Sequence, residues 1–224
     1  MITPLLKNYK AIIALFFYLL FFQNANAQNV DKNSAWLQVA KDDFYDHPEE
    51  EFLKGYTQLF EIVNHEKSIG IDWSIQIPMS WDAQKVEDDS GNIQKFLSEN
   101  GNGQESISFM VVDLPIERKI TESEINACFT VKRMKRNLKD IGKFKRFEKM
   151  TFDGINGGYL EYDSVLENSK TKARIFQSSF IYNQKLCIVF CAVKREVRQT
   201  KDMDRFAKLF RLMAASIKIN QQEK

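Results

Sequence analysis

The sequence predicts an α+β protein: an antiparallel sheet with a meander in its C-terminal half, helices packed on both faces as an α/β/α sandwich, and an N-terminal amphipathic helix. Three observations predict this. Apolar residues alternate along several β-rich runs. Short turns join the last four runs, which favours antiparallel neighbours. The segment Leu186–Val193 is apolar at every position, which is typical of a central strand covered on both faces.

A secretory signal peptide is predicted at the N-terminus. Lys7 and Lys10 precede the apolar run Ala11–Phe22, and Ala25-Asn26-Ala27 supplies the small residues of a cleavage site. The run is shorter than the about 20 residues that a spanning helix needs, so a retained anchor is the weaker alternative. We expect residues 1–27 to be removed, the mature chain to have no transmembrane segment, and the protein to be periplasmic or secreted.

Residues 28–66 are expected to form a mobile leader followed by a helical preface, and residues 67–220 the main domain. His47-Pro48 with three glutamates after it is typical of a helix start. The apolar residues that follow have spacings of 4, 3, 1 and 3, which predicts one helical face: Phe52, Tyr56, Leu59, Phe60 and Val63.

Alternation of apolar and polar residues over Ile69–Ile77 predicts the first strand of the main domain. Further β-rich runs are expected at Asn92–Ser98, Ser106–Asp113, Phe144–Phe152, Gly157–Leu166, Ala173–Tyr182 and Lys185–Lys194. Helical periodicity predicts two covering helices, with apolar stripes at Cys128, Val131, Met134, Leu138 and Ile141, and at Met203, Phe206, Leu209, Phe210 and Met213. A short edge strand is expected at Ser216–Ile219.

This element order resembles the PsbP-like α/β/α sandwich. The resemblance covers Ser68 to Ile219 and includes the short motifs Ile77-Pro78-Met79-Ser80-Trp81, Gly157-Gly158-Tyr159 and Ala215-Ser216-Ile217. It implies a small exported or lumenal protein that acts as an extrinsic binding or assembly module without a shared catalytic centre. It implies no particular site residue, and the segment 34–66 departs from the family's core pattern.

The overall charge argues against nucleic acid as a partner. Residues 1–27 hold two of the 32 basic residues and none of the 30 acidic ones, so the mature chain would have a net charge of zero. Binding to nucleic acid is driven by phosphate neutralisation, which needs an excess of positive charge.

One segment is nevertheless strongly basic. Nine basic residues and two acids lie between Lys132 and Lys149. Such a block is usually a solvated helix face with its loop, and cations near a helix C-terminus are favoured by the helix dipole. The alternative is a surface for an envelope protein or another anionic surface, formed by Lys132, Arg133, Lys135, Arg136, Lys139, Lys143, Lys145 and Arg146.

Catalytic and metal-binding patterns are scarce. His47 and His65 are the only histidines, and the spacings typical of zinc sites do not occur, so we expect no metal and no cofactor. The leading hypothesis is therefore a non-catalytic binding module. The alternatives are a hydrolase using one of these histidines with a carboxylate, or a thiol-redox protein using Cys128.

The three cysteines allow at most one intramolecular disulfide. Cys187 and Cys191 lie four residues apart on one predicted strand, roughly 13 Å at the usual rise, which is too far for a bond between them. We expect both thiols to be buried as small apolar groups. A disulfide from Cys128 to Cys187 or Cys191 can form only if the helix that carries Cys128 packs on the face of the sheet that holds the other two cysteines.

Overall fold

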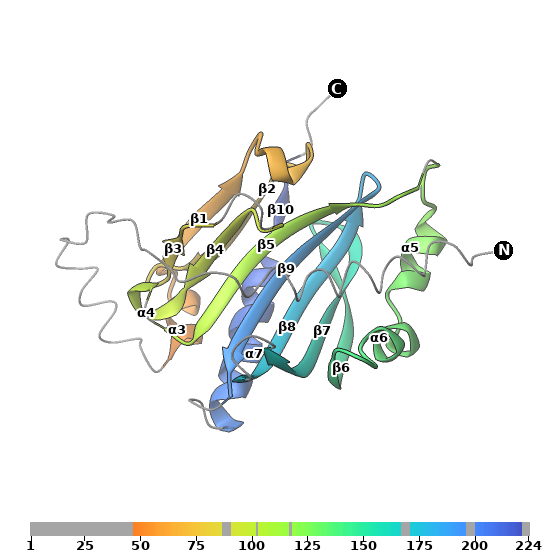
Figure 1. The fold of residues 1–224 in the computed structure, drawn as a ribbon. Coiled ribbons are helices and arrows are strands. Elements are labelled where there is room, and N and C mark those ends of the chain that lie inside the picture. Colours follow the sequence, from red (N-terminus) through yellow and green to blue (C-terminus); the bar gives the residue numbers. More distant parts are fainter. Residues whose placement is uncertain are drawn as a thin grey trace.

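The computed structural model describes residues 47–86, 91–101, 103–116, 118–166, 171–195 and 200–220 (Figure 1). The predicted signal peptide and the leader up to residue 46 lie outside the described residues. No described helix has the length and apolar character needed to cross a membrane.

Two antiparallel sheets form the body of the protein. Seven strands pair in the order β3-β4-β5-β9-β8-β7-β6. Their bounds are β3 Asp82–Gln84, β4 Gln94–Leu97, β5 Glu105–Asp113, β6 Gly142–Phe152, β7 Ile155–Leu166, β8 Thr171–Tyr182 and β9 Lys185–Lys194. A smaller sheet has the order β1-β2-β10, with β1 Thr57–Ile62, β2 Trp73–Pro78 and β10 Lys218–Ile219.

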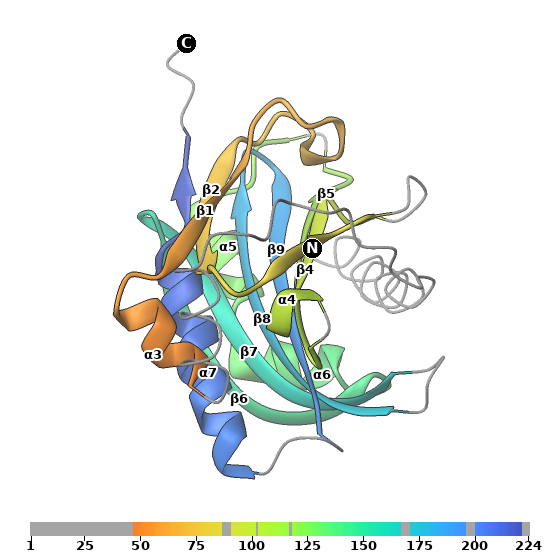
Figure 2. The same ribbon diagram turned by 90° about the vertical axis from the view of Figure 1, so that its left-hand side faces the viewer.

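Helices lie on both faces of the large sheet, as the sequence predicts. The long helix α7 (Thr200–Ala215) and the small sheet cover one face, which we call the α7 face (Figures 1 and 2). The helices α5 (Glu122–Cys128) and α6 (Val131–Asn137) pack on the other face, which we call the α6 face, where they contact β7 and β6. The remaining short helices are α3 Pro48–Leu53, the 3-10 turn η1 Glu66–Ser68 and α4 Ser98–Gly101.

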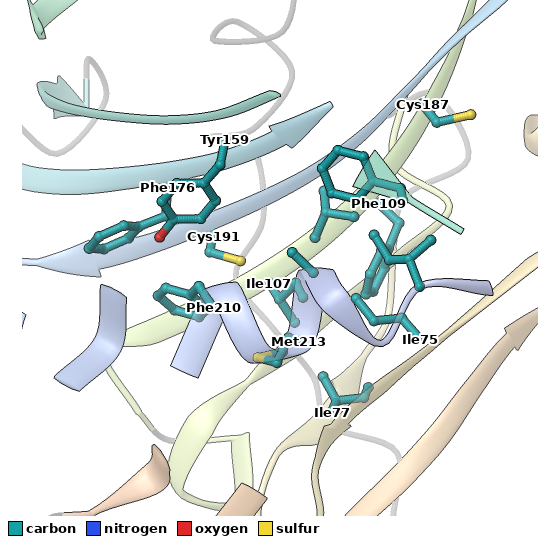
Figure 3. Packing of buried hydrophobic residues seen from close by; sticks show 14 of the residues in the cluster. Ile75, Ile77, Ile107, Phe109, Tyr159, Phe176, Cys187, Cys191, Phe210 and Met213 are labelled. Carbon is teal, nitrogen blue, oxygen red and sulfur yellow. The ribbon is translucent and has the colours of Figure 1, made fainter. Parts of the chain in front are cut away.

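Each face of the large sheet has its own apolar core. The larger core joins the α7 face, α7 and the small sheet, and it contains both Cys187 and Cys191 (Figure 3). The smaller core joins alternate residues of the same strands to α5 and α6. β9 contributes side chains alternately to both cores: Val189, in the larger core, is 2% exposed, and Ile188, in the smaller core, is 3% exposed. This burial on two sides explains why eight consecutive residues of β9 are apolar.

The helix predicted to run from Pro48 through Val63 forms only in its first part, and the prediction is wrong beyond Leu53. The helix begins at Pro48 as expected but ends at Leu53, and Gly55 follows with φ +82°, a conformation that glycine adopts readily. The chain then continues as β1, which pairs with β2. Leu59 is 59% and Val63 is 51% exposed, so these two residues of the predicted helical stripe do not face the core.

Two further boundaries differ from expectation. The first strand of the main domain begins at Trp73, because Ile69 and Gly70 have φ +52° and +76° and break the extended backbone. The single helix expected through Ile141 is two helices, with the buried Phe129 between them. Thr130 begins the second one, its side chain accepting the Arg133 N–H at 3.3 Å.

Buried polar contacts hold α3 against the body. The Ser80 N–H and hydroxyl both donate to the carboxylate of Glu51 at 2.7 Å, and Glu51 is 0% exposed. The motif that contains Ser80 therefore lies where the small sheet meets α3, and its Trp81 packs edge-on against Phe210 of α7.

Candidate functional site

The basic segment from Lys132 to Lys149 is divided between α6 and the edge strand β6. On α6, Met134 and Leu138 are buried against the sheet, which leaves the basic residues of the helix on its outer side. Lys132, Lys135, Arg136 and Lys139 are exposed, and Arg133 is half-buried. These four exposed residues define what we call the α6 surface.

The cations of the α6 surface have no carboxylate partner within the described part of the chain. Among the described residues, Lys132, Arg136 and Lys139 make no ion pair, and the ammonium of Lys135 lies 5.0 Å from the centroid of the Phe144 ring. Lys132 and Arg136 are four residues apart on α6 and share one side of the helix, and Lys139 lies in the turn that follows it. The α6 surface is thus a solvated row of positive charge.

The cations of β6 have a different environment. A β-bulge interrupts the pairing of β6 with β7 between Phe144 and Arg146. Lys145 lies in this bulge and its Nζ is 3.2 Å from Oδ2 of Asp163. Arg146 donates to Glu148 at 3.0 Å. Two of the eight predicted site residues are therefore paired within the protein.

Strand register shows on which face these pairs lie. Residues opposite each other in antiparallel strands share a face, and faces alternate along a strand. Tyr159 is on the α7 face because its hydroxyl donates to Ala207 O in α7 at 3.3 Å. Its next-but-one neighbours Glu161 and Asp163 are on the same face, opposite Arg146 and Lys143.

Asp163 is the centre of an ionic cluster on the α7 face. Three cations surround it: Lys145, Arg195 at 3.2 Å and Arg174, which also pairs with Glu161. Burial acts to raise the pKa of Asp163, but the hydrogen bonds from Arg174 and Lys145 and the charges of Arg174 and Arg195 outweigh it and hold that pKa below its usual value.

A second ionic group on the α7 face connects β6 to α7 through Glu148, which pairs with Arg146. Arg211 of α7 lies 3.2 Å from Glu148, and its guanidinium stands 5.1 Å from the centroid of the Tyr159 ring. Sequence analysis identified none of Glu161, Asp163, Arg174 or Arg211 as part of a charged site. In the sequence, the only indication of this charged site is that charged residues alternate along β7 and β8. That alternation identifies a shared site only when the strand register shows which of the residues face each other.

The histidines do not form a buried catalytic pair. His47 Nδ1 lies 3.7 Å from Glu50 Oε1, beyond hydrogen-bond distance, and both side chains are substantially exposed. His65 accepts the Lys67 N–H at 3.1 Å and caps η1. Among the described residues, no group of three or more histidine, cysteine or acidic side chains is arranged to hold a metal ion.

All three cysteines are free thiols. Cys128 lies on the α6 face and Cys187 and Cys191 on the α7 face, so the sheet separates them and the conditional disulfide does not form. Burial raises the pKa of the Cys187 thiol to about 12 and also raises that of Cys191. Burial raises the pKa of Cys128 more than the nearby charge of Arg133 lowers it.

Comparisons with known proteins show likeness in fold. No family model matches the chain. No curated protein matches it either. Several solved structures are similar, among them PsbP (CyanoP) from Synechocystis sp. PCC 6803, LpqN from Mycobacterium tuberculosis and the Ran-binding protein Mog1p from Saccharomyces cerevisiae.

The likeness extends over most of each chain. CyanoP is 17% identical, with a TM-score of 0.47, and the match covers 74% of this chain and 94% of CyanoP. LpqN is 8% identical, with a TM-score of 0.50, and the match covers 75% of this chain and 93% of LpqN. Mog1p is 9% identical, with a TM-score of 0.41, and the match covers 73% of this chain and 96% of Mog1p. These structures include a PsbP protein, the family that the element order resembles. The likeness to LpqN, at a TM-score of 0.50, shows a shared fold.

Proposed function

We propose that this protein is a non-catalytic exported module that binds or helps to assemble an envelope component, and that the α6 surface docks an acidic partner. The N-terminal pattern of Lys7, Lys10 and Ala11–Phe22 supports export. LpqN, which has a similar fold, is described as involved in cell envelope biogenesis. The single observation that carries the docking surface is the set of exposed cations on α6 and in the turn after it, for which the described residues offer no carboxylate partner.

The geometry favours this role over the two catalytic alternatives. A hydrolase needs a histidine held by a carboxylate beside a nucleophile, whereas His47 is exposed and His65 uses its Nδ1 to cap a turn. A reactive thiol needs a lowered pKa, whereas burial raises the pKa of Cys128. An open charged surface needs neither arrangement, because binding by charge complementarity requires only that the cations be accessible.

Charge reversal tests the surface with a matched control. The protein is produced from the full chain, and its binding to a fluorescent octaglutamate peptide is measured by anisotropy at several salt concentrations. The variant K132E/R136E should weaken binding about tenfold or more at low salt, because two attractions become repulsions. The control K172E/K208E changes the net charge equally at two other exposed positions and should bind as the wild type does.

Two outcomes would contradict the proposal. Equal loss in both variants would mean that binding follows net charge and does not depend on the α6 surface. Binding to vesicles of phosphatidylglycerol with no binding to the peptide would identify a lipid surface as the partner. Thermal unfolding of both variants checks that α6 remains folded, since R136E places a negative charge near the helix C-terminus, where the helix dipole disfavours it.

A further inference from the structure

Strand β6 has a free edge. It is the last of the seven strands in the large sheet and pairs only with β7 among the described strands. Outside that pairing, its one described backbone hydrogen bond is from Gly142 N–H to Leu138 O at 3.0 Å. From Lys143 to Phe152 the outward N–H and C=O groups therefore have no backbone partner in the described part of the chain, and such an edge is a template for another strand.

Cations flank this edge on both faces of the sheet. Lys143 and Arg146 lie opposite Asp163 and Glu161 and so project on the α7 face. Lys149 lies opposite Gly158, whose neighbours Phe147 and Phe129 belong to the core under α5 and α6, so Lys149 projects on the α6 face. Lys143, Arg146 and Lys149 are all exposed.

The charge determines which kind of strand fits this edge. β6 carries four cations and one acid, so a second copy of the chain pairing β6 with β6 would bring mostly like charges together, which is destabilising, and the bulge at Lys145 further disturbs a regular pairing. Lysines and bulges on edge strands are known protections against such self-association. The same residues attract a strand whose side chains are carboxylates on both faces.

We propose that an acidic, extended segment of a partner protein adds to the large sheet as a new strand beside β6. Main-chain hydrogen bonds to the free edge supply affinity, and pairs of its carboxylates with Lys143 and Lys149, reinforced by the α6 surface, supply specificity. This inference rests on the proposed function, because it gives a binding mode to the same acidic partner. A strand of about five or six residues is sufficient.

Two peptides of identical charge test the binding mode. One has the sequence Thr-Glu-Glu-Val-Glu-Glu-Thr with both ends capped, and the other has the same sequence with every peptide nitrogen methylated, so that it cannot pair as a strand. The wild-type protein should bind the first peptide at least about tenfold more tightly than the second, since the second loses its backbone donors. Amide hydrogen exchange should slow within residues 143–152 when the first peptide is added.

Protein variants separate the two proposals. K143E and K149E should each weaken binding of the first peptide about threefold or more, while K172E/K208E leaves it unchanged. Equal binding of both peptides, with no slowing of exchange in β6, would overturn strand addition and leave docking on the α6 surface intact. Failure of both peptides and of octaglutamate to bind would overturn both proposals.

Discussion

Replacing Gly158 by alanine adds one methyl group where β7 is closely packed against two aromatic rings. A Cβ atom there would lie 2.7 Å from Cζ of Phe147 and 3.2 Å from Cδ1 of Phe129. Phe129 is 2% exposed and has no room to move, so the ring of Phe147 has to shift. Overpacking of this kind lowers the free energy of unfolding by about 1–3 kcal/mol. Alanine also reduces the entropy of the unfolded chain relative to glycine, which raises the free energy of unfolding by about 0.4–1 kcal/mol. We expect G158A to lower the free energy of unfolding by about 1–2 kcal/mol.

The neighbouring Gly157 provides the comparison. Its Cβ would overlap the backbone oxygen of Ser179 on β8 and lie 2.7 Å from Cε2 of Phe152. A backbone oxygen held in a strand ladder cannot rotate away, whereas the Phe147 ring is half-buried and can. G157A should therefore cost more than G158A, about 3 kcal/mol or more.

Urea unfolding followed by tryptophan fluorescence measures both costs, because Trp73 and Trp81 are 0% and 1% exposed. The substitution F147L in the G158A background should restore part of the lost stability, since it removes the ring that meets the new methyl group. The same substitution should not rescue G157A. Costs below about 0.5 kcal/mol for both alanine variants, or equal rescue of both by F147L, would refute this account of the Gly157-Gly158-Tyr159 motif.

Three further outcomes follow from the structure. D163N should lower the free energy of unfolding by about 1–3 kcal/mol at neutral pH, because it removes the carboxylate shared by Lys145, Arg174 and Arg195, although Arg174 keeps its pair with Glu161. Because folding lowers the pKa of Asp163, this contribution should disappear as the pH falls from about 3.9 through that lowered pKa, so that urea unfolding of wild type and variant converges in acid. L59T, at an exposed position, should change the free energy of unfolding by less than about 0.5 kcal/mol. I75A, at a 0% exposed position, should lower it by about 2–5 kcal/mol. A large loss of stability in L59T would mean that Leu59 is buried, as the predicted helix requires, and would argue against β1. Cys187 and Cys191 should react with a thiol reagent at pH 8 only after unfolding, and rapid labelling of the native protein, followed by mass spectrometry, would contradict their burial.

The central strands were predicted well because burial on two sides leaves a strong pattern. The run predicted at Lys185–Lys194 has the bounds observed for β9, and the meander from β6 to β9 is as expected. β1 was missed because a half-exposed strand carries a weak pattern. Leu59 and Phe60 of β1 and Val63 just after it happen to have helical spacing, and only Gly55 marks the point at which the helix ends.

The second sheet was not predicted for a related reason. β10 is two residues long, and its pairing with β2 depends on Asp153, whose carboxylate accepts the Ile219 N–H at 3.0 Å and contacts Lys218 at 3.2 Å. Asp153 belongs to the turn between β6 and β7. Because it is 65 or more residues away from β10 in sequence, no local pattern connects the two.

The candidate site shows most clearly what a linear charge pattern omits. Lys135 and Lys145 belong to one basic block, yet the sheet places the first on the α6 face and the second against Asp163 on the other. The bulge beside Phe144 directs Lys145 to that face and leaves Phe144 beneath Lys135. Bulges depend on how two strands pair and have no reliable local signature. The sequence therefore predicts that this segment is basic, and the fold determines which of its cations are paired. Lys145 and Arg146 have carboxylate partners, whereas the cations of the α6 surface have none among the described residues and remain available to an acidic partner.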